Sequence, residues 1–376
     1  MRVPPAAIYV PEEDRKWILE QIDACLQSGQ LTLGKNGKQL EEEFAALCGT
    51  KYAVAVNSGT ASIEIILRAI GVDGREVIVP TNTFYATGGA VVHAGGRPRF
   101  VDCEPGSFAL DADSLEKAIG PDTAAVVMVH IGGFISPDML RIKAICDRHN
   151  IPLVEDAAHA HGSSLNGQKA GSFGIAGSFS FYPTKVITSA EGGVIVTDDE
   201  GLYKEALIYR DQGKEGFTTN FHVRLGYNWR LSEPNAIIGL SQLRRLGQFS
   251  EHRRSVAGVY DEMLGRLGER AMPVRQAPGV VSNYYKYMVM LGDADRPSLK
   301  KLMREEFDVG LSGEVYDTPL HKQPVFAPWV NGDSLAMAED ICARHVCLPT
   351  SAVMTEDDAR YVVESLEATL DRLAKN

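Results

Sequence analysis

The sequence describes an acidic chain of ordinary globular composition. It has 376 residues, of which 44% are hydrophobic and 23% charged, and its net charge is −11 from 38 basic and 49 acidic side chains. At about 150 residues per domain, this length suggests two or three domains. The basic residues are scattered along the chain, which argues against nucleic acid or an anionic membrane as the main partner but leaves anionic small molecules open.

The cysteines and the chain start indicate a reducing compartment. None of the six cysteines belongs to a CxxC pair, and we interpret them as small buried apolar side chains, with neither a metal site nor disulfides. They are Cys25, Cys48, Cys103, Cys146, Cys342 and Cys347. The stretch MRVPPAAIYVPEEDRKW becomes charged too early for a signal peptide, and the most apolar run, 124–135, is too short to span a bilayer. We therefore expect a cytoplasmic protein.

Short β-branched runs alternate with helical patterns through the first two thirds of the chain. The predicted strands are residues 52–56, 76–80, 97–102, 124–130, 151–156, 177–181 and 193–197. Within 60–70, apolar residues at positions 63, 66, 67 and 70 share one face of a helix. Strands separated by helices indicate βαβ units, so we predict an α/β fold with a mainly parallel sheet covered on both sides.

The pattern changes near residue 231. Residues 231–267 predict a long helix, with Ser232 as its N-cap and Pro234 in its first turn. Beyond it we expect a smaller α/β domain, packed closely on the first because no flexible linker intervenes. Its predicted elements are strands over 284–291 and around 309–316 and helices near 297–307 and 355–374.

Three predicted strands end in polar motifs. VNSGTAS (56–62) leads into a helix whose free N–H groups could bind phosphate, although a turn with a threonine cap is an equally simple reading. PTNTFYAT (80–87) places Phe84 and Tyr85 where a ligand could stack, or in the core. IPLVEDAAHAHG (151–162) delivers Asp156 and then His159; a buried acid there needs a cationic partner, unless it only caps a helix and His159 is exposed.

A lysine in an apolar setting follows these motifs. In FSFYPTKVITSAEGG (179–193), Lys185 lies between aromatic and β-branched residues. It either snorkels to the surface or is kept partly desolvated as a neutral, nucleophilic amine. Ser180 precedes it and could reach a phosphate, while the glycines at 192 and 193 allow close backbone approach.

Together these parts match the needs of pyridoxal 5′-phosphate (PLP). The cofactor requires a phosphate cradle, a stacking ring, a lysine for its aldehyde and a carboxylate that keeps the pyridine nitrogen protonated. Each part is ambiguous alone, but their joint occurrence favours a PLP enzyme.

Several motifs resemble the DegT/DnrJ/EryC1/StrS family of PLP-dependent nucleotide-sugar aminotransferases. The resemblance extends from about residue 30 to LPTS (348–351), and its most specific motifs are SFxFYPTK and GYNxRL. It implies the fold-type I, aspartate aminotransferase-like fold, with a large PLP-binding domain over 1–245 and a small C-terminal domain over 246–376. The segments that carry it are EVIVPTNTFYAT, VEDAAHAHGS, GSFGIAGSFSFYPTK, AEGGVIVTDDE, LGYNWRLSEPNAIIGLSQLRRL and PLHKQPVF.

The resemblance also implies roles for individual residues. Lys185 is the expected Schiff-base lysine and proton shuttle, Asp156 pairs with the pyridine nitrogen, and His159 lies near the phenolic oxygen of the cofactor. Phe84 stacks on the ring. The phosphate is expected to contact Gly59, Thr60, Ala61 and Ser180, together with Asn228 of a neighbouring subunit. A homodimer with shared active sites follows.

The implied reaction moves an amino group from L-glutamate to the keto carbon of a nucleotide-linked 4-keto-6-deoxy sugar. Lysine at 185 favours transamination, since related deoxysugar dehydratases carry histidine there, and VITSAEGG resembles C4-aminating enzymes. The alternatives are a C3-keto sugar or keto-cyclitol aminotransferase, or a PLP-binding regulator without turnover. HIGGFISPDM (130–139) and EVYDTPLH (314–321) depart from the family pattern. Near the latter, Tyr316 and His321 are candidate substrate contacts or packing residues of a subunit interface.

Overall fold

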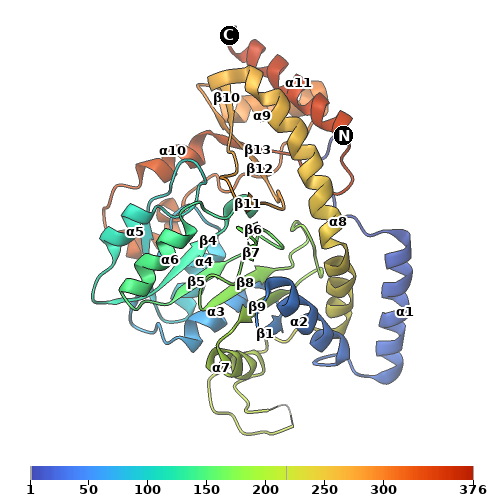
Figure 1. Cartoon of the computed structure of the whole chain (residues 1–376), viewed down its shortest axis with the longest axis vertical. Helices are drawn as coiled ribbons and strands as arrows, with labels where there is room; N and C mark the ends of the chain where they lie inside the picture. The colour runs from blue at the N-terminus through green and yellow to red at the C-terminus, as the bar shows by residue number, and fades with distance from the viewer. Residues whose placement is uncertain (1, 217, 376) are drawn as a thin grey trace.

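A seven-stranded sheet forms the centre of the structure, a computed structural model that describes residues 2–216 and 218–375 (Figure 1). The strands lie in the order β1-β9-β8-β5-β4-β2-β3, and only β9 runs antiparallel to its neighbours. The prediction of a mainly parallel sheet is confirmed. The strands are β1 Tyr52–Val56, β2 Glu76–Pro80, β3 Arg97–Val101, β4 Thr123–Val129, β5 Leu153–Asp156, β8 Ala176–Ser180 and β9 Gly193–Thr197.

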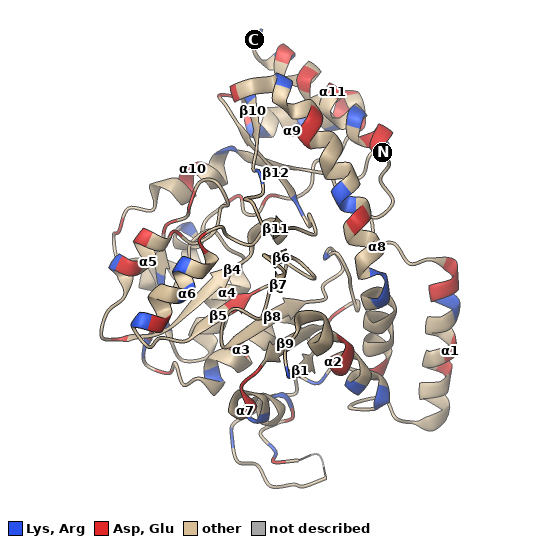
Figure 2. Ribbon diagram, in the orientation of Figure 1, with Lys and Arg blue, Asp and Glu red and all other residues tan. Residues whose placement is uncertain are grey.

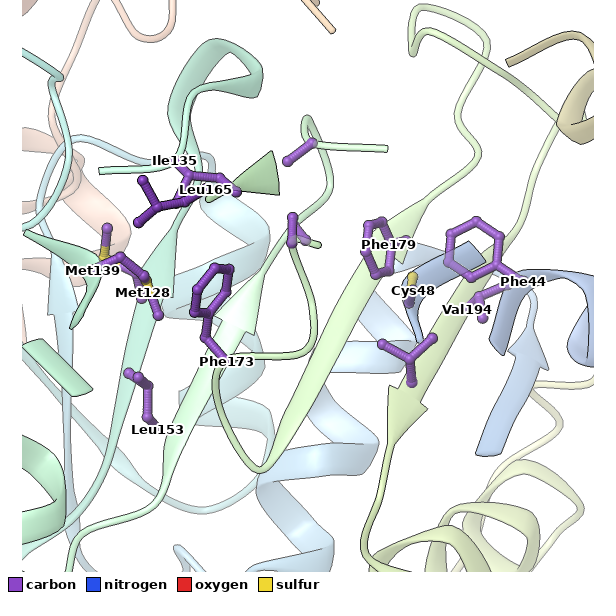
Figure 3. Close-up of a cluster of buried hydrophobic side chains, with 14 of the residues drawn as sticks. Phe44, Cys48, Met128, Ile135, Met139, Leu153, Leu165, Phe173, Phe179 and Val194 are labelled. Carbon is purple, nitrogen blue, oxygen red and sulfur yellow. The ribbon is translucent and has the colours of Figure 1, made fainter. Parts of the chain in front are cut away.

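Both faces of this sheet are buried. Along β1, Ala53 and Ala55 belong to one hydrophobic cluster, whereas Val54 and Val56 belong to another, as expected for side chains that alternate between the faces of a strand. Figure 3 shows part of the first cluster, with Phe44 beside Phe179. The helices around the sheet are α2 Lys35–Cys48, α3 Gly59–Ala69, α4 Tyr85–His93, α5 Ala112–Ala118, α6 Met139–Arg148 and α7 Glu200–Arg210. Helix α1, Glu12–Ser28, lies apart from the sheet and packs through Ile18 and Cys25 on Ile237.

The long helix α8, Glu233–Leu264, links the large unit to a smaller one (Figure 1). It begins as predicted: the Ser232 hydroxyl accepts a hydrogen bond from the Asn235 N–H (3.4 Å), and a proline stands in the first turn. Leu240 packs in a cluster of the large unit, and Tyr260 packs in the cluster of the small one. We propose that the domain boundary, placed at 245/246 from the sequence, lies within this continuous helix.

The small unit contains a three-stranded antiparallel sheet in the order β10-β12-β13. Strand β12 and helices α9 and α11 were predicted, whereas β10, α10 and β13 were missed. The elements are β10 Ala271–Pro273, β12 Tyr287–Leu291, α9 Arg296–Phe307, α10 Ala336–Arg344, β13 His345–Leu348 and α11 Glu356–Leu373. A second small sheet joins the two parts of the chain: β6 Ser164–Leu165, which follows β5, pairs with β7 Gln168–Lys169 on one side and with β11 Val280–Val281, which follows β10, on the other.

The prediction of a strand around residues 309–316 is wrong. The segment is extended, but only isolated bridges tie it to other backbone, from Val309 and from Ser312. Farther along, the Val315 N–H donates to Nε2 of His345 (2.9 Å) and the Tyr316 N–H donates to Oδ1 of Asn82 (2.8 Å). Because side chains satisfy these N–H groups, no ladder forms, and β13 takes the place beside β12.

Charged residues of both signs are interspersed over the helices (Figure 2). All six cysteines are free and buried, as predicted. Across residues 2–216 and 218–375, no helix has both the length and the apolar character needed to cross a membrane.

Candidate active site

The motifs singled out in the sequence meet at one edge of the central sheet. Strands β1, β5 and β8 end there, and the antiparallel strand β9 begins there, with Gly193 paired to both Val56 and Ser180. A cavity of about 370 Å³ opens at this edge. The predicted site residues that line it are Gly59, Thr60, Phe84, Asp156, His159, Ser180, Lys185 and Tyr316.

The amine of Lys185 lies beside the ring of Tyr285 in the wall of this cavity. The residue is half-buried, and its Nζ lies 4.9 Å from the centre of the Tyr285 ring. Removal from water lowers the pKa of Lys185, and this effect outweighs the opposing influence of Tyr285 and Asp156. A larger fraction of this amine is therefore neutral than for a lysine in water, which is the state that attacks a carbonyl carbon.

Asp156 ends β5 and is buried within hydrogen-bond donors. Its Oδ2 accepts from the Thr87 hydroxyl (2.7 Å), and its Oδ1 accepts from the Ala158 N–H (3.2 Å). Since Thr87 gives its only hydroxyl proton to Asp156, the neighbouring Thr83 hydroxyl, 2.7 Å away, must donate to Thr87. Burial raises the pKa of Asp156 despite these donors, so a cation beside it would stabilise the carboxylate.

His159 is buried, so the alternative from the sequence, in which Asp156 only caps a helix and His159 faces solvent, is wrong. Its Nδ1 accepts from the Gly132 N–H (3.3 Å), and its Nε2 lies 3.1 Å from the Tyr316 hydroxyl. Burial and, secondarily, Lys185 hold the pKa of His159 well below its usual range, so the ring is neutral. With Nδ1 accepting, the proton is assigned to Nε2. Gly132 belongs to the HIGGFISPDM segment that differs from the family pattern, and its N–H thus fixes the tautomer of the His159 ring.

The first turn of α3 forms a cradle of backbone N–H groups. In the described part of the chain, the N–H groups of Gly59 and Thr60 have no hydrogen-bond partner, as is usual for a helix start. The Ala61 N–H is bound to the Ser58 hydroxyl (3.1 Å), and Ala61 does not line the cavity. A Cβ added to Gly59 would lie 2.7 Å from Cβ of Ser180, so glycine allows the hydroxyl to face this turn. The cradle suits a phosphate group.

The aromatic residues of the PTNTFYAT motif point in different directions. Phe84 lines the cavity, 5.8 Å from the Tyr316 ring, and is 56% exposed. Tyr85 instead contacts Phe326, 5.8 Å between ring centres.

Two other predicted residues lie outside the cavity. His321 is held by the Thr81 hydroxyl (2.7 Å) and by Glu339 (3.1 Å), so the structure does not bring it to the site. Asn228 is exposed and bridges to Asp211, away from the cavity of its own chain.

Sequence reasoning missed two residues that touch the reactive groups. Thr87 binds Asp156, and Tyr285 contacts both Lys185 and His159, the latter at 4.4 Å between ring centres. The hydroxyl-rich PTNTFYAT motif contains a signal for Thr87. Tyr285 lies two residues before β12, in a run whose sequence predicts only a strand.

Comparison with known proteins decides the family. The chain matches the model of the DegT/DnrJ/EryC1/StrS aminotransferase family over residues 12–367. It belongs to this family. Among family relatives, it is 34% identical over 370 residues to the GDP-perosamine synthase of Caulobacter vibrioides, covering 98% of each chain. It is also 34% identical to the UDP-N-acetyl-3-dehydro-alpha-D-glucosamine 3-aminotransferase of Acidithiobacillus ferrooxidans, covering 97% of this chain and 96% of the relative.

A solved structure agrees with the fold. The putative sugar aminotransferase Spr1654 from Streptococcus pneumoniae, in its PMP-form, superposes with a TM-score of 0.90 at 26% identity, covering 99% of this chain and 100% of that chain. The expectation of a PLP-dependent aminotransferase fold is confirmed. The cavity of this family member also fits PLP: Lys185 for the aldehyde, buried Asp156 for a protonated ring nitrogen, and the free N–H groups at Gly59 and Thr60 for the phosphate.

Proposed function

We propose that this aminotransferase uses PLP to move an amino group from L-glutamate to the keto carbon of a nucleotide-linked 4-keto-6-deoxy sugar. One observation carries the proposal. One cavity is lined by Lys185, whose pKa is lowered, by the buried carboxylate of Asp156 and by the helix start at Gly59. When bound, PLP supplies an aldehyde and a protonated ring that withdraws electrons.

Each of these residues has a defined task. Lys185 would hold the cofactor through its aldehyde, and its ε-amine, when free, would serve as the general base and acid that accepts and returns a proton at Nζ. Asp156, held by Thr87, keeps its charge beside the pyridine nitrogen. His159, with its proton on Nε2, places a donor at the Tyr316 side of the cavity and would serve the phenolic oxygen of the cofactor. Phe84, which lines the same cavity, would stack on the ring.

The active site is proposed to be complete only in a homodimer. Asn228 lies away from the cavity of its own chain, which supports a role at the phosphate of a partner. Its loop also exposes apolar side chains, with Leu225 93% and Phe221 67% exposed, and helix α1 exposes Leu19 and Leu26. Exposed apolar surface of this kind is typical of interfaces between subunits. The free buried cysteines support a cytoplasmic location.

The choice of a 4-keto sugar rests on residues 186–193, VITSAEGG, which resemble C4-aminating relatives. The second candidate is a C3-keto sugar, favoured by the similarity to the 3-aminotransferase. The test is incubation of the PLP-loaded protein with L-glutamate and a panel of nucleotide-linked 4-keto-6-deoxy sugars, 3-keto sugars and a keto-cyclitol. We expect 2-oxoglutarate release with the 4-keto sugars and a product amine at C4 by NMR. Amination of only the 3-keto sugars, or of only the cyclitol, would contradict the proposal of a 4-keto sugar substrate.

A further inference from the structure

A second cavity adjoins the active site. It has a volume of about 200 Å³, and Thr184 and Tyr285 line both cavities. Its other walls come from residues 5–8 near the chain start, from α8 and from the small unit. A ligand that reacts at Lys185 could therefore extend past Tyr285 into this space.

Among the described residues, two cations and no carboxylate line the second cavity. They are Arg253 of α8 and Lys286, which immediately precedes β12. Arg253 is 5% exposed and donates to uncharged acceptors, the Thr350 carbonyl (2.9 Å) and hydroxyl (3.1 Å), while its buried Nε has no partner among residues 2–216 and 218–375. Buried charge without a counter-ion is costly, which points to a ligand that supplies one.

Lys286 has neither a hydrogen bond nor an ion pair from its side chain within the described residues. The acid that acts on it electrostatically, Glu314, is already bound to Lys300 (2.6 Å). Burial is the main cause of a lowered pKa of Lys286, with Arg253 adding to it, so an arriving anion would favour the charged amine.

The ring of Tyr285 connects the two lysines. Its centre lies 4.9 Å from Nζ of Lys185 and 5.1 Å from Nζ of Lys286, so the two amines are separated by no more than the sum of these distances. Apart from Lys185, no lysine or arginine among the described residues lines the main cavity. Both substrates of the proposed reaction carry anionic groups, and the main cavity of this chain offers them no other cation.

We propose that the second cavity is an oxyanion subsite in which Lys286, with Arg253 in the same wall, binds an anionic group of a substrate reacting at Lys185. The inference rests on the proposed function for the identity of that substrate. Two sources share this chemistry: a carboxylate of the amino donor and the diphosphate of the nucleotide sugar.

The test measures binding without turnover. Isothermal titration of PLP-loaded protein would use glutarate as a dicarboxylate that lacks an amino group and inorganic pyrophosphate as a probe for the diphosphate. Loss of one charge-assisted hydrogen bond corresponds to roughly a ten- to hundredfold weaker affinity. We expect this loss of affinity in Lys286→Met for at least one probe, whereas Lys286→Arg should largely retain the affinity. The control is Lys301→Met, a change at an exposed lysine of α9, which should leave the affinity unchanged.

The outcomes separate the two sources. Weaker glutarate binding alone assigns the subsite to the donor, weaker pyrophosphate binding alone assigns it to the nucleotide, and weaker binding of both assigns it to each substrate in turn. Unchanged affinity for both probes overturns the proposal. In the wild-type protein, acetylation of Lys286 should slow when the bound probe is present, and equal rates would also overturn it. Because neither measurement needs a keto sugar, failure here is distinguishable from failure of the proposed reaction.

Discussion

The hydroxyl of Thr87 donates a 2.7 Å hydrogen bond to Oδ2 of Asp156, and the two side chains come from different elements, α4 and β5. Burial raises the pKa of Asp156, and this bond is the largest influence acting against it. Thr87 therefore helps to keep a buried carboxylate charged, although it does not line the main cavity itself.

Replacing Thr87 with valine should raise the pKa of Asp156 and weaken its partnership with the cofactor ring. Because a hydrogen bond to a charged group contributes about 1.5–3 kcal/mol, we expect kcat to fall roughly ten- to hundredfold. The acid limb of the pH–rate profile should move to higher pH, because the Asp156 carboxylate of the variant becomes protonated at a higher pH than in the wild-type protein. Thr87→Ser keeps the hydroxyl and should keep both properties; a valine variant with an unshifted profile would contradict this role.

Adding a methyl group to Gly59 should close the phosphate cradle. The new Cβ would lie 2.7 Å from Cβ of Ser180, so the helix start or the β8 end must move. We expect Gly59→Ala to weaken PLP binding at least tenfold, about 1.4 kcal/mol, measured by fluorescence titration. The matched control is Gly247→Ala in α8, where nothing lies within 4 Å of the added Cβ and about 0.5–1 kcal/mol of stability should be gained. Equal PLP affinity in both variants would count against the cradle.

Lys185→Met should stabilise the cofactor-free protein near neutral pH. The folded state lowers the pKa of Lys185 below its ordinary value of 10.5, so the unfolded chain binds the extra proton between the two values and stability rises with pH through that window. Each unit of lowering corresponds to about 1.4 kcal/mol. Urea unfolding at several pH values should give a larger free energy of unfolding for Lys185→Met than for the wild-type protein, and this difference should shrink toward pH 10.5. A difference that does not depend on pH would refute desolvation of this amine.

Asn228 should act on the site of the partner subunit. Lys185→Ala and Asn228→Ala homodimers should both lose activity, because each lacks a part of every site. In a hybrid dimer made from both variants, one site has neither change. Random reassociation should therefore restore roughly a quarter of wild-type activity. No recovery, despite hybrid formation confirmed by mass spectrometry, would show that Asn228 does not serve a neighbouring site.

The sequence predicted the sheet well because most of its strands are short apolar, β-branched runs, such as YAVAV in β1 and TAAVVMV in β4. All seven strands lie within a few residues of their predicted places, and parallel order then gathers Asp156 and Lys185 at one edge. What could not be predicted depends on packing between units. Tyr285 contacts Lys185 although 100 residues separate them in the sequence. The 309–316 segment does not pair because side chains bind its N–H groups.

The most direct test of the central claim is the position of the covalent cofactor adduct. Borohydride reduction of the PLP-loaded protein, followed by peptide mapping, should find a single pyridoxyl group on the ε-amine of Lys185. The Lys185→Met protein, treated in the same way, should yield no stoichiometric adduct. A pyridoxyl group on another side chain of the wild-type protein, or on none, would contradict the account.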